Sequence, residues 1–128
     1  EQPGKIPFVS LPGGRIEPGE DPAEAAGREL KEETGYGAAE FELWYAEQPM
    51  TKIDWAVYMF IARGCIKKSN QQLDGGERIS TREITFEDFI ERAAKGEFWG
   101  DIAQRVLAAK LEPAKMAELK NLLQSVHD

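Results

Sequence analysis

The sequence predicts a layered α/β domain, which other schemes would class as α+β, and three observations lead to this prediction. Several segments carry apolar residues at helical spacing between an N-terminal capping residue and a terminal glycine. Residues 54–62 (DWAVYMFIA) are instead apolar on both alternating sets, as in a strand covered on both faces. The 128 residues, 41% hydrophobic and 30% charged, are enough for one core. Strands mixed with helices favour layers around that core, and we expect residues 1–128 to form a single domain.

The first half of the chain begins with a predicted strand and two turns, at residues 5–11 (KIPFVSL), 12–14 (PGG) and 17–20 (EPGE). A helix is predicted from Pro22 to Thr34. Asp21 is its expected N-cap, Pro22 occupies the first helical position, and Glu24 completes a capping box. Gly35 is the expected C-terminal stop.

The rest of the chain alternates between predicted strands and helices. Residues 41–46 form the next strand, and residues 54–62 form a strand that should be central in its sheet because both faces are apolar. A polar loop (SNQQLDGGER) then leads to a fourth predicted strand at 79–84. Three helices follow, one opening at Thr85 and ending near Gly96, one at about 101–111, and one at about 113–126. We interpret the last helix as an appendage or a dimer contact.

Charge and composition exclude several classes of protein. The formal charge is −7 and the basic residues are scattered, which argues against a nucleic-acid partner. The longest apolar run is too short to cross a bilayer, so no membrane association is expected. One cysteine, Cys65, cannot form an internal disulfide, and we therefore expect a cytoplasmic protein.

The helix at 22–34 carries an unusual cluster of acids. Wound at 100° per residue, it places Glu29, Glu32 and Glu33 away from a stripe of small and apolar residues, which are Ala23, Ala26, Gly27, Leu30 and Thr34. The acids repel one another and lie near the negative end of the helix dipole. A solvated acidic face is the simpler explanation. The glycine-rich loop GGRIEPGE that enters the helix favours a cation site instead, and oxygen ligands alone suit Mg²⁺ or Mn²⁺.

The spacing of these residues resembles a known signature. Gly14, Glu20 and the run Arg28-Glu29-Leu30-x-Glu32-Glu33-x-Gly35 are similar to the box of the Nudix hydrolases, with Tyr36 where an aliphatic residue is usual. The resemblance implies an α/β/α sandwich with a mixed sheet. It also implies hydrolysis of a nucleoside diphosphate linked to another moiety, with the metal offsetting the charge of both the acids and the pyrophosphate.

The resemblance assigns roles to individual residues. Glu29, Glu32 and Glu33 are the implied metal ligands, joined by the carbonyl oxygen of Gly13. Arg28 would orient these glutamates through salt bridges, and Glu20 would organise the loop. Both residues are assigned by their positions in the family signature.

A second segment resembles the ADP-ribose pyrophosphatase type of this family. Its run Leu73-Asp74-Gly75-Gly76-Glu77-Arg78-Ile79 is similar to a loop in which a glutamate acts as general base or extra ligand. Glu77 is therefore the predicted base, with Glu32 as the competing choice. A loop residue can approach the attacking water after substrate enters.

Three functions are weighed for the chain. The first is a pyrophosphatase that acts on ADP-ribose or a sugar nucleotide, the second is a nucleoside triphosphate pyrophosphatase, and the third is a non-catalytic nucleotide sensor. The box begins at residue 14, which leaves little chain for the strands that usually precede it. We therefore expect that N-terminal strands are missing from this chain or that a second subunit, in a homodimer, completes the sheet.

Overall fold

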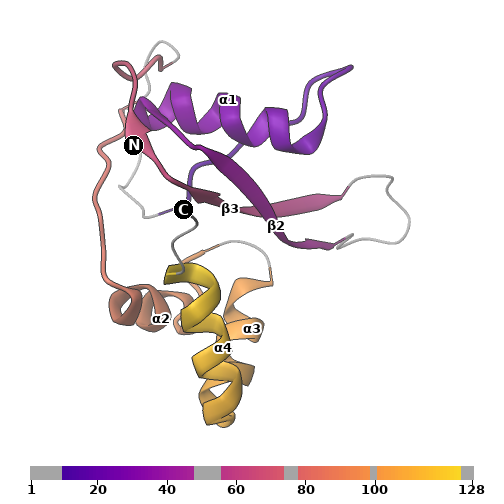
Figure 1. Cartoon of the computed structure of the whole chain (residues 1–128), viewed down its shortest axis with the longest axis vertical. Coiled ribbons are helices and arrows are strands. Elements are labelled where there is room, and N and C mark those ends of the chain that lie inside the picture. Colours follow the sequence, from indigo (N-terminus) through magenta and orange to yellow (C-terminus); the bar gives the residue numbers. More distant parts are fainter. Residues whose placement is uncertain (1–9, 48–55, 74–77, 99–100, 125–128) are drawn as a thin grey trace. The chain divides into compact units, whose positions relative to one another are not determined.

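The computed structural model describes residues 10–47, 56–73, 78–98 and 101–124. These residues group into two compact units, the first within residues 12–81 and the second from residue 82 onward together with residues 10 and 11. The first unit contains α1 and the strands β1 to β4, and the second contains α2, α3 and α4 (Figure 1). Helices and strands on one chain confirm the predicted α/β class.

Helix α1 spans Pro22–Thr34, as predicted. Asp21 caps it from an extended backbone conformation, and its Oδ1 accepts a hydrogen bond from the Glu24 N–H at 3.0 Å. Gly35 ends the helix with φ of +79°, and its N–H donates to the Lys31 carbonyl at 2.8 Å. Local capping chemistry therefore sets both ends.

The inner side of α1 differs in part from the predicted stripe. Thr34 is buried as expected, but the second buried residue is Ala25, which lies outside that stripe. Gly27 faces β2, because a Cβ atom built on it would lie 3.4 Å from the Phe41 ring. The glycine thus lets α1 approach the strand closely.

Two antiparallel strand pairs accompany α1. Strand β2 (Glu40–Glu47) pairs with β3 (Val57–Arg63), with Leu43 opposite Phe60 and a register shift between Leu43 and Tyr45. Strand β1 (Tyr36–Gly37) pairs with β4 (Ile66–Lys67). Within the described ranges both pairs are antiparallel and β3 has β2 as its one neighbour, so the central position predicted for it is not seen there.

A buried arginine fastens the end of the longer pair. Arg63 is 6% exposed, and its Nε and Nη2 donate to Glu42 Oε1 at 3.0 and 2.8 Å. Its backbone carbonyl accepts the Ala39 N–H at 2.7 Å. These bonds join β2 to β3 just before the chain turns into β4.

The strand predicted at 79–84 is wrong. Residues 78–85 are described and contain no strand. The Ile79 carbonyl accepts a side-chain amide of Gln71 instead of a strand N–H, and Ile84 is 38% exposed. Four consecutive polar residues, 80–83, leave no apolar face to hold a strand against a core. The predicted strand at 5–11 lies outside the described residues except for positions 10 and 11, which are not in a strand.

Among the described residues of the second unit there are three helices, α2 (Phe86–Ala94), α3 (Ile102–Leu111) and α4 (Pro113–Gln124), close to the predicted bounds. Thr85 caps α2 by accepting the Asp88 N–H at 3.0 Å. The core contains Ile102 and Val106, both 0% exposed, and the rings of Phe89 and Phe98 stack at 5.3 Å. No helix within the described residues has the length and apolar character needed to span a membrane.

Gly35→Ala is expected to lower the free energy of unfolding by more than about 2 kcal/mol. Alanine would have to keep the left-handed backbone conformation of Gly35, which is unfavourable for a residue with a Cβ atom. Its Cβ would also contact the Ser69 carbonyl group, with the carbon atom at 3.0 Å. Gly96→Ala is the matched control. Gly96 has a similar φ of +82° but open space around it, so the substitution should cost about 1 kcal/mol. Urea denaturation of both variants measures the difference, and equal losses would contradict the close contact at Gly35.

Candidate functional site

The loop before α1 is held against the acidic face of the helix. The Gly13 N–H donates to Glu33 Oε2 at 2.8 Å. A Cβ atom at Gly14 would lie 2.5 Å from the carboxylate carbon of Glu29. The loop therefore approaches two of the predicted ligands through glycine backbone, and a larger residue at position 14 would require the Glu29 carboxylate to move.

Arg28 lies at the centre of the acidic cluster. Its Nε and Nη2 donate to the two oxygens of Glu20 at 2.8 and 3.0 Å. Its Nη1 donates to Glu29 Oε1 at 2.7 Å and lies 3.5 Å from Glu32 Oε2. The bonds to Glu20 and Glu29 raise the pKa of the guanidinium. One cation thus orients three carboxylates, and Nη2 also reaches the Arg15 carbonyl at 2.8 Å.

Glu20 connects the loop to the helix. Besides the paired contact with Arg28, its Oε1 accepts the Glu17 N–H at 3.0 Å. The hydrogen bond from Arg28, followed by that from Glu17, lowers the pKa of the Glu20 carboxyl below its ordinary 4.5. The Glu20 carboxylate therefore links the backbone of the loop, at Glu17, to the Arg28 side chain on the helix.

Glu20→Gln is expected to remove a pH-dependent part of the stability. The lowered pKa means that the ionised carboxylate stabilises the folded state above pH 4.5, and that this contribution is lost as the pH falls below that value. Urea midpoints of the wild type and the variant should therefore differ at neutral pH, and the difference should shrink as the pH is lowered below 4.5. A difference that stays constant across this pH series would contradict this role.

The predicted ligands have the chemistry of a divalent metal site. Glu29 and Glu32 converge on one positive group, and their side chains are 16% and 39% exposed. Carboxylate and carbonyl oxygens suit Mg²⁺ or Mn²⁺. Across the described ranges no three His, Cys, Asp or Glu side chains are arranged to hold a metal. In this arrangement Glu29 Oε1 accepts from Arg28 and Glu33 Oε2 accepts from the Gly13 N–H. The donor set fits a metal, which would have to compete with the guanidinium.

The C-terminal end of α1 receives hydrogen bonds from residues 67–72. The Lys67 ammonium donates to the Thr34 carbonyl at 2.7 Å, and the Gln72 N–H donates to the Glu32 carbonyl at 2.7 Å. The N–H groups of Lys68 and Ser69 both donate to the Gly35 carbonyl. We name these residues, 67–72, the capping segment. It supplies donors to helix carbonyls that have no partner within the helix.

Gln71 belongs to the capping segment but reaches further. Its Nε2 donates to the Glu33 carbonyl at 2.6 Å and to the Ile79 carbonyl at 2.8 Å. The sequence reasoning missed this residue and Lys67. An indirect signal was present, because a helix that ends in acids needs outside donors and the polar run 69–72 (SNQQ) could supply them. The predicted base Glu77 lies outside the described residues.

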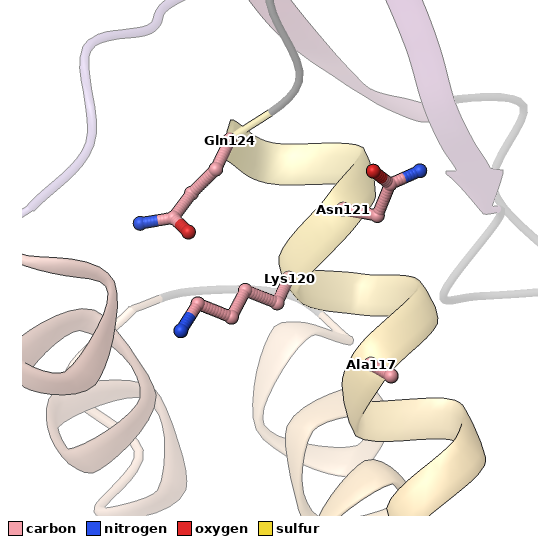
Figure 2. A pocket seen from close by; sticks show the side chains of 4 residues that line it. All are labelled: Ala117, Lys120, Asn121 and Gln124. Carbon is pink, nitrogen blue, oxygen red and sulfur yellow. The ribbon is translucent and has the colours of Figure 1, made fainter.

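A shallow hollow on α4 is lined by Ala117, Lys120, Asn121 and Gln124 (Figure 2). Lys120 extends its ammonium to 3.9 Å from Glu87 Oε2 and 5.9 Å from the centre of the Phe86 ring. Among the described residues, those that line the hollow come from one helix and include neither a carboxylate nor a thiol. The residues around Arg28 therefore form the stronger candidate site.

Comparison with known proteins gives two partial relatives. The chain is 36% identical over 87 residues to a protein of Bacillus methanolicus named "Methanol dehydrogenase activator", covering 66% of this chain and 46% of that protein. It is 31% identical over 96 residues to an "ADP-ribose pyrophosphatase" of Bacillus subtilis strain 168, covering 72% of this chain and 51% of that protein. The chain thus spans about half the length of these curated relatives.

A third match covers a shorter segment of the chain and has a higher sequence identity. Over 34 residues the chain is 62% identical to a Bacillus subtilis strain 168 protein named "Putative 8-oxo-dGTP diphosphatase", covering 27% of this chain and 23% of that protein. The family described as "NUDIX domain" matches residues 1–104, which include every predicted site residue. Since this match covers most of the sequence and agrees with the loop and helix described above, the chain belongs to the Nudix family.

Proposed function

We propose that this protein hydrolyses the pyrophosphate bond of a nucleoside diphosphate derivative, such as ADP-ribose or a sugar nucleotide, to a nucleoside monophosphate and a sugar phosphate. The observation that carries the proposal is the arrangement around Arg28, which gathers Glu29 and Glu32, while the Gly13 N–H holds Glu33. The match to a relative named ADP-ribose pyrophosphatase supports this choice of substrate.

In this proposal Mg²⁺ is the metal, with Mn²⁺ able to replace it. Glu29, Glu32, Glu33 and the Gly13 carbonyl would hold it. Bound metal would neutralise phosphate oxygens and favour ionisation of water, which an acidic surface cannot do alone. Arg28 would keep the carboxylates oriented, because its guanidinium already contacts Glu29 and Glu32 through the same nitrogen.

The reaction is a displacement at phosphorus. Water forms a new P–O bond, the bond to the leaving phosphate breaks in line with it, and a carboxylate accepts the proton from the water. Glu77 is the proposed acceptor, with Glu32 as the alternative. The capping segment supports Glu77, because it ends at Gln72 and brings the chain next to the end of α1 just before residues 74–77.

A substrate panel tests the proposal. The full chain is incubated with ADP-ribose, sugar nucleotides, dinucleoside polyphosphates and oxidised nucleoside triphosphates, with and without Mg²⁺, and the products are identified by chromatography. Formation of AMP and ribose phosphate in the presence of Mg²⁺ is the expected result. Absence of hydrolysis across the panel, repeated with Mn²⁺ in place of Mg²⁺, would refute the enzymatic proposal.

A nucleoside triphosphate pyrophosphatase is the second candidate. The observation that favours it is the 62% identity over 34 residues to the protein named a diphosphatase of 8-oxo-dGTP. Release of pyrophosphate from a triphosphate in the same panel would select this alternative. A non-catalytic nucleotide sensor is less well supported, since all three box glutamates and Arg28 are present.

A homodimer in the cytoplasm remains a prediction. Large apolar side chains are available for a contact, because Leu107 and Leu111 of α3 are 47% and 83% exposed. Sedimentation equilibrium tests the assembly, and a mass equal to one chain at all concentrations would reject the dimer. Cell fractionation tests the location.

A further inference from the structure

Gln71 joins two separate parts of the first unit through one amide group. Its Nε2 carries two N–H groups, and the structure gives it two acceptors, the carbonyls of Glu33 at 2.6 Å and Ile79 at 2.8 Å. The side chain is half-buried, so water competes poorly for these bonds. A single side chain thereby couples the last turn of α1 to the chain at residue 79.

Glu33 is held by hydrogen bonds both at its carboxylate and at its backbone carbonyl. Its carboxylate accepts the Gly13 N–H at 2.8 Å, and its backbone carbonyl accepts the Gln71 amide. This carbonyl belongs to the last turn of α1, where helix carbonyls lack partners within the helix and the turn tends to fray. The nearby glutamates add repulsion and an unfavourable dipole at the same place. A donor from outside therefore matters more here than at an ordinary helix end.

Neighbouring donors do not duplicate this arrangement. Lys67 and Gln72 bond to the Thr34 and Glu32 carbonyls, and each acts as a helix cap. Like Gln72, Gln71 bonds to a residue that carries a proposed metal ligand, but it does so through its side chain, and the same amide also bonds to Ile79. A cap that only stabilises the helix is the simpler role, and it predicts a change in unfolding temperature without a change in metal affinity of the folded protein.

We infer that Gln71 is a positioning residue for the metal site, because it fixes the Glu33 backbone so that the Glu33 carboxylate is directed at the cation. The inference rests on the proposed function, since it needs a metal to bind at Glu29, Glu32 and Glu33. Gln71 itself touches neither metal nor substrate. Its effect passes through the backbone of one ligand, as with other groups that orient metal ligands.

The test measures Mn²⁺ affinity from the electron paramagnetic resonance signal of free Mn²⁺, on full chains that circular dichroism shows to be folded. Gln71→Met keeps the length of the side chain but removes both donors, and should raise the dissociation constant about tenfold. Gln71→Lys restores N–H donors on a side chain of at least the same length. It should recover part of the affinity, because its added positive charge repels Mn²⁺. Gln72→Met is the matched control. It makes the same change one residue later and keeps the backbone bond to Glu32. Its dissociation constant for Mn²⁺ should stay within about twofold of the wild-type value.

The outcomes separate this inference from the proposed function. If the wild type binds Mn²⁺ and Gln71→Met binds it equally well, the positioning role is rejected while the proposed function stands. If the wild type takes up no Mn²⁺, both are rejected. Should Gln71→Met fail to fold, Gln71→Asn replaces it, because the shorter amide cannot bridge both carbonyls. The role then requires weaker binding in Gln71→Asn than in Gln71→Lys, and any other ranking overturns it.

Discussion

Glu33→Gln is expected to lower kcat/KM for the best substrate of the panel by more than about 100-fold, since loss of groups that only orient metal ligands already costs about 10- to 100-fold. The fold should survive. The bond from the Gly13 N–H to Glu33 Oε2 needs an acceptor oxygen, and the glutamine amide still offers one. The variant therefore removes the charge and keeps the contact.

The matched control for this variant is Glu118→Gln, which makes the same change on the exposed surface of α4. Steady-state kinetics and the thermal midpoint, measured with and without Mg²⁺, compare the two. Wild-type turnover in Glu33→Gln would contradict a role for this carboxylate in the reaction. If the variant instead bound nucleotide normally and the wild type did not turn it over, the protein would be a sensor.

Arg28→Met is expected to lower kcat/KM about 10- to 100-fold and to reduce the thermal midpoint in metal-free buffer. The variant leaves Glu20, Glu29 and Glu32 close together without the cation that contacts them. Added Mg²⁺ should raise the midpoint of the variant more than that of the wild type, because metal then supplies the missing positive charge.

Two further variants define the part played by the guanidinium. Arg28→Lys keeps the charge but cannot form the paired bonds to Glu20. It should recover part of the thermal midpoint and little of the activity. Arg92→Met is the control, because Arg92 forms a similar helical pair with Asp88 at 3.0 Å in the second unit. Loss of activity in Arg92→Met equal to that in Arg28→Met would show that the effect is general destabilisation.

Features with a local cause could be predicted from the sequence. The bounds of α1 follow from Asp21, Pro22 and Gly35, and Thr85 gives the start of α2 in the same way. The box residues are also close in sequence, so helical spacing and the adjoining loop were enough to group Arg28 with Glu29 and Glu32. Capping and spacing of this kind act within a few residues.

Features with a distant cause could not be predicted in this way. The short pair of β1 and β4 joins residues about 30 positions apart, and two-residue strands leave no periodic pattern. Where a strand was expected at 79–84, the Ile79 carbonyl bonds to the Gln71 side chain, a contact that no local pattern indicates. Arg28 was expected to contact the box glutamates, but the bond from its Nη2 to the Arg15 carbonyl depends on the path of the loop. Each of these contacts requires the folded chain.

The capping segment has a consequence for the order in which the protein folds. The bonds from Lys67 to Thr34 and from Gln71 to Glu33 connect residues 33 and 38 positions apart. During synthesis α1 is complete long before these donors leave the ribosome. Its first turn, closed by Asp21, can form at once. Its final turn has only the local Gly35 cap until a long loop closes and brings donors to the last helix carbonyls. We therefore expect a nascent chain that stops before residue 67 to carry a helix that is ordered at its start and frayed at the glutamates.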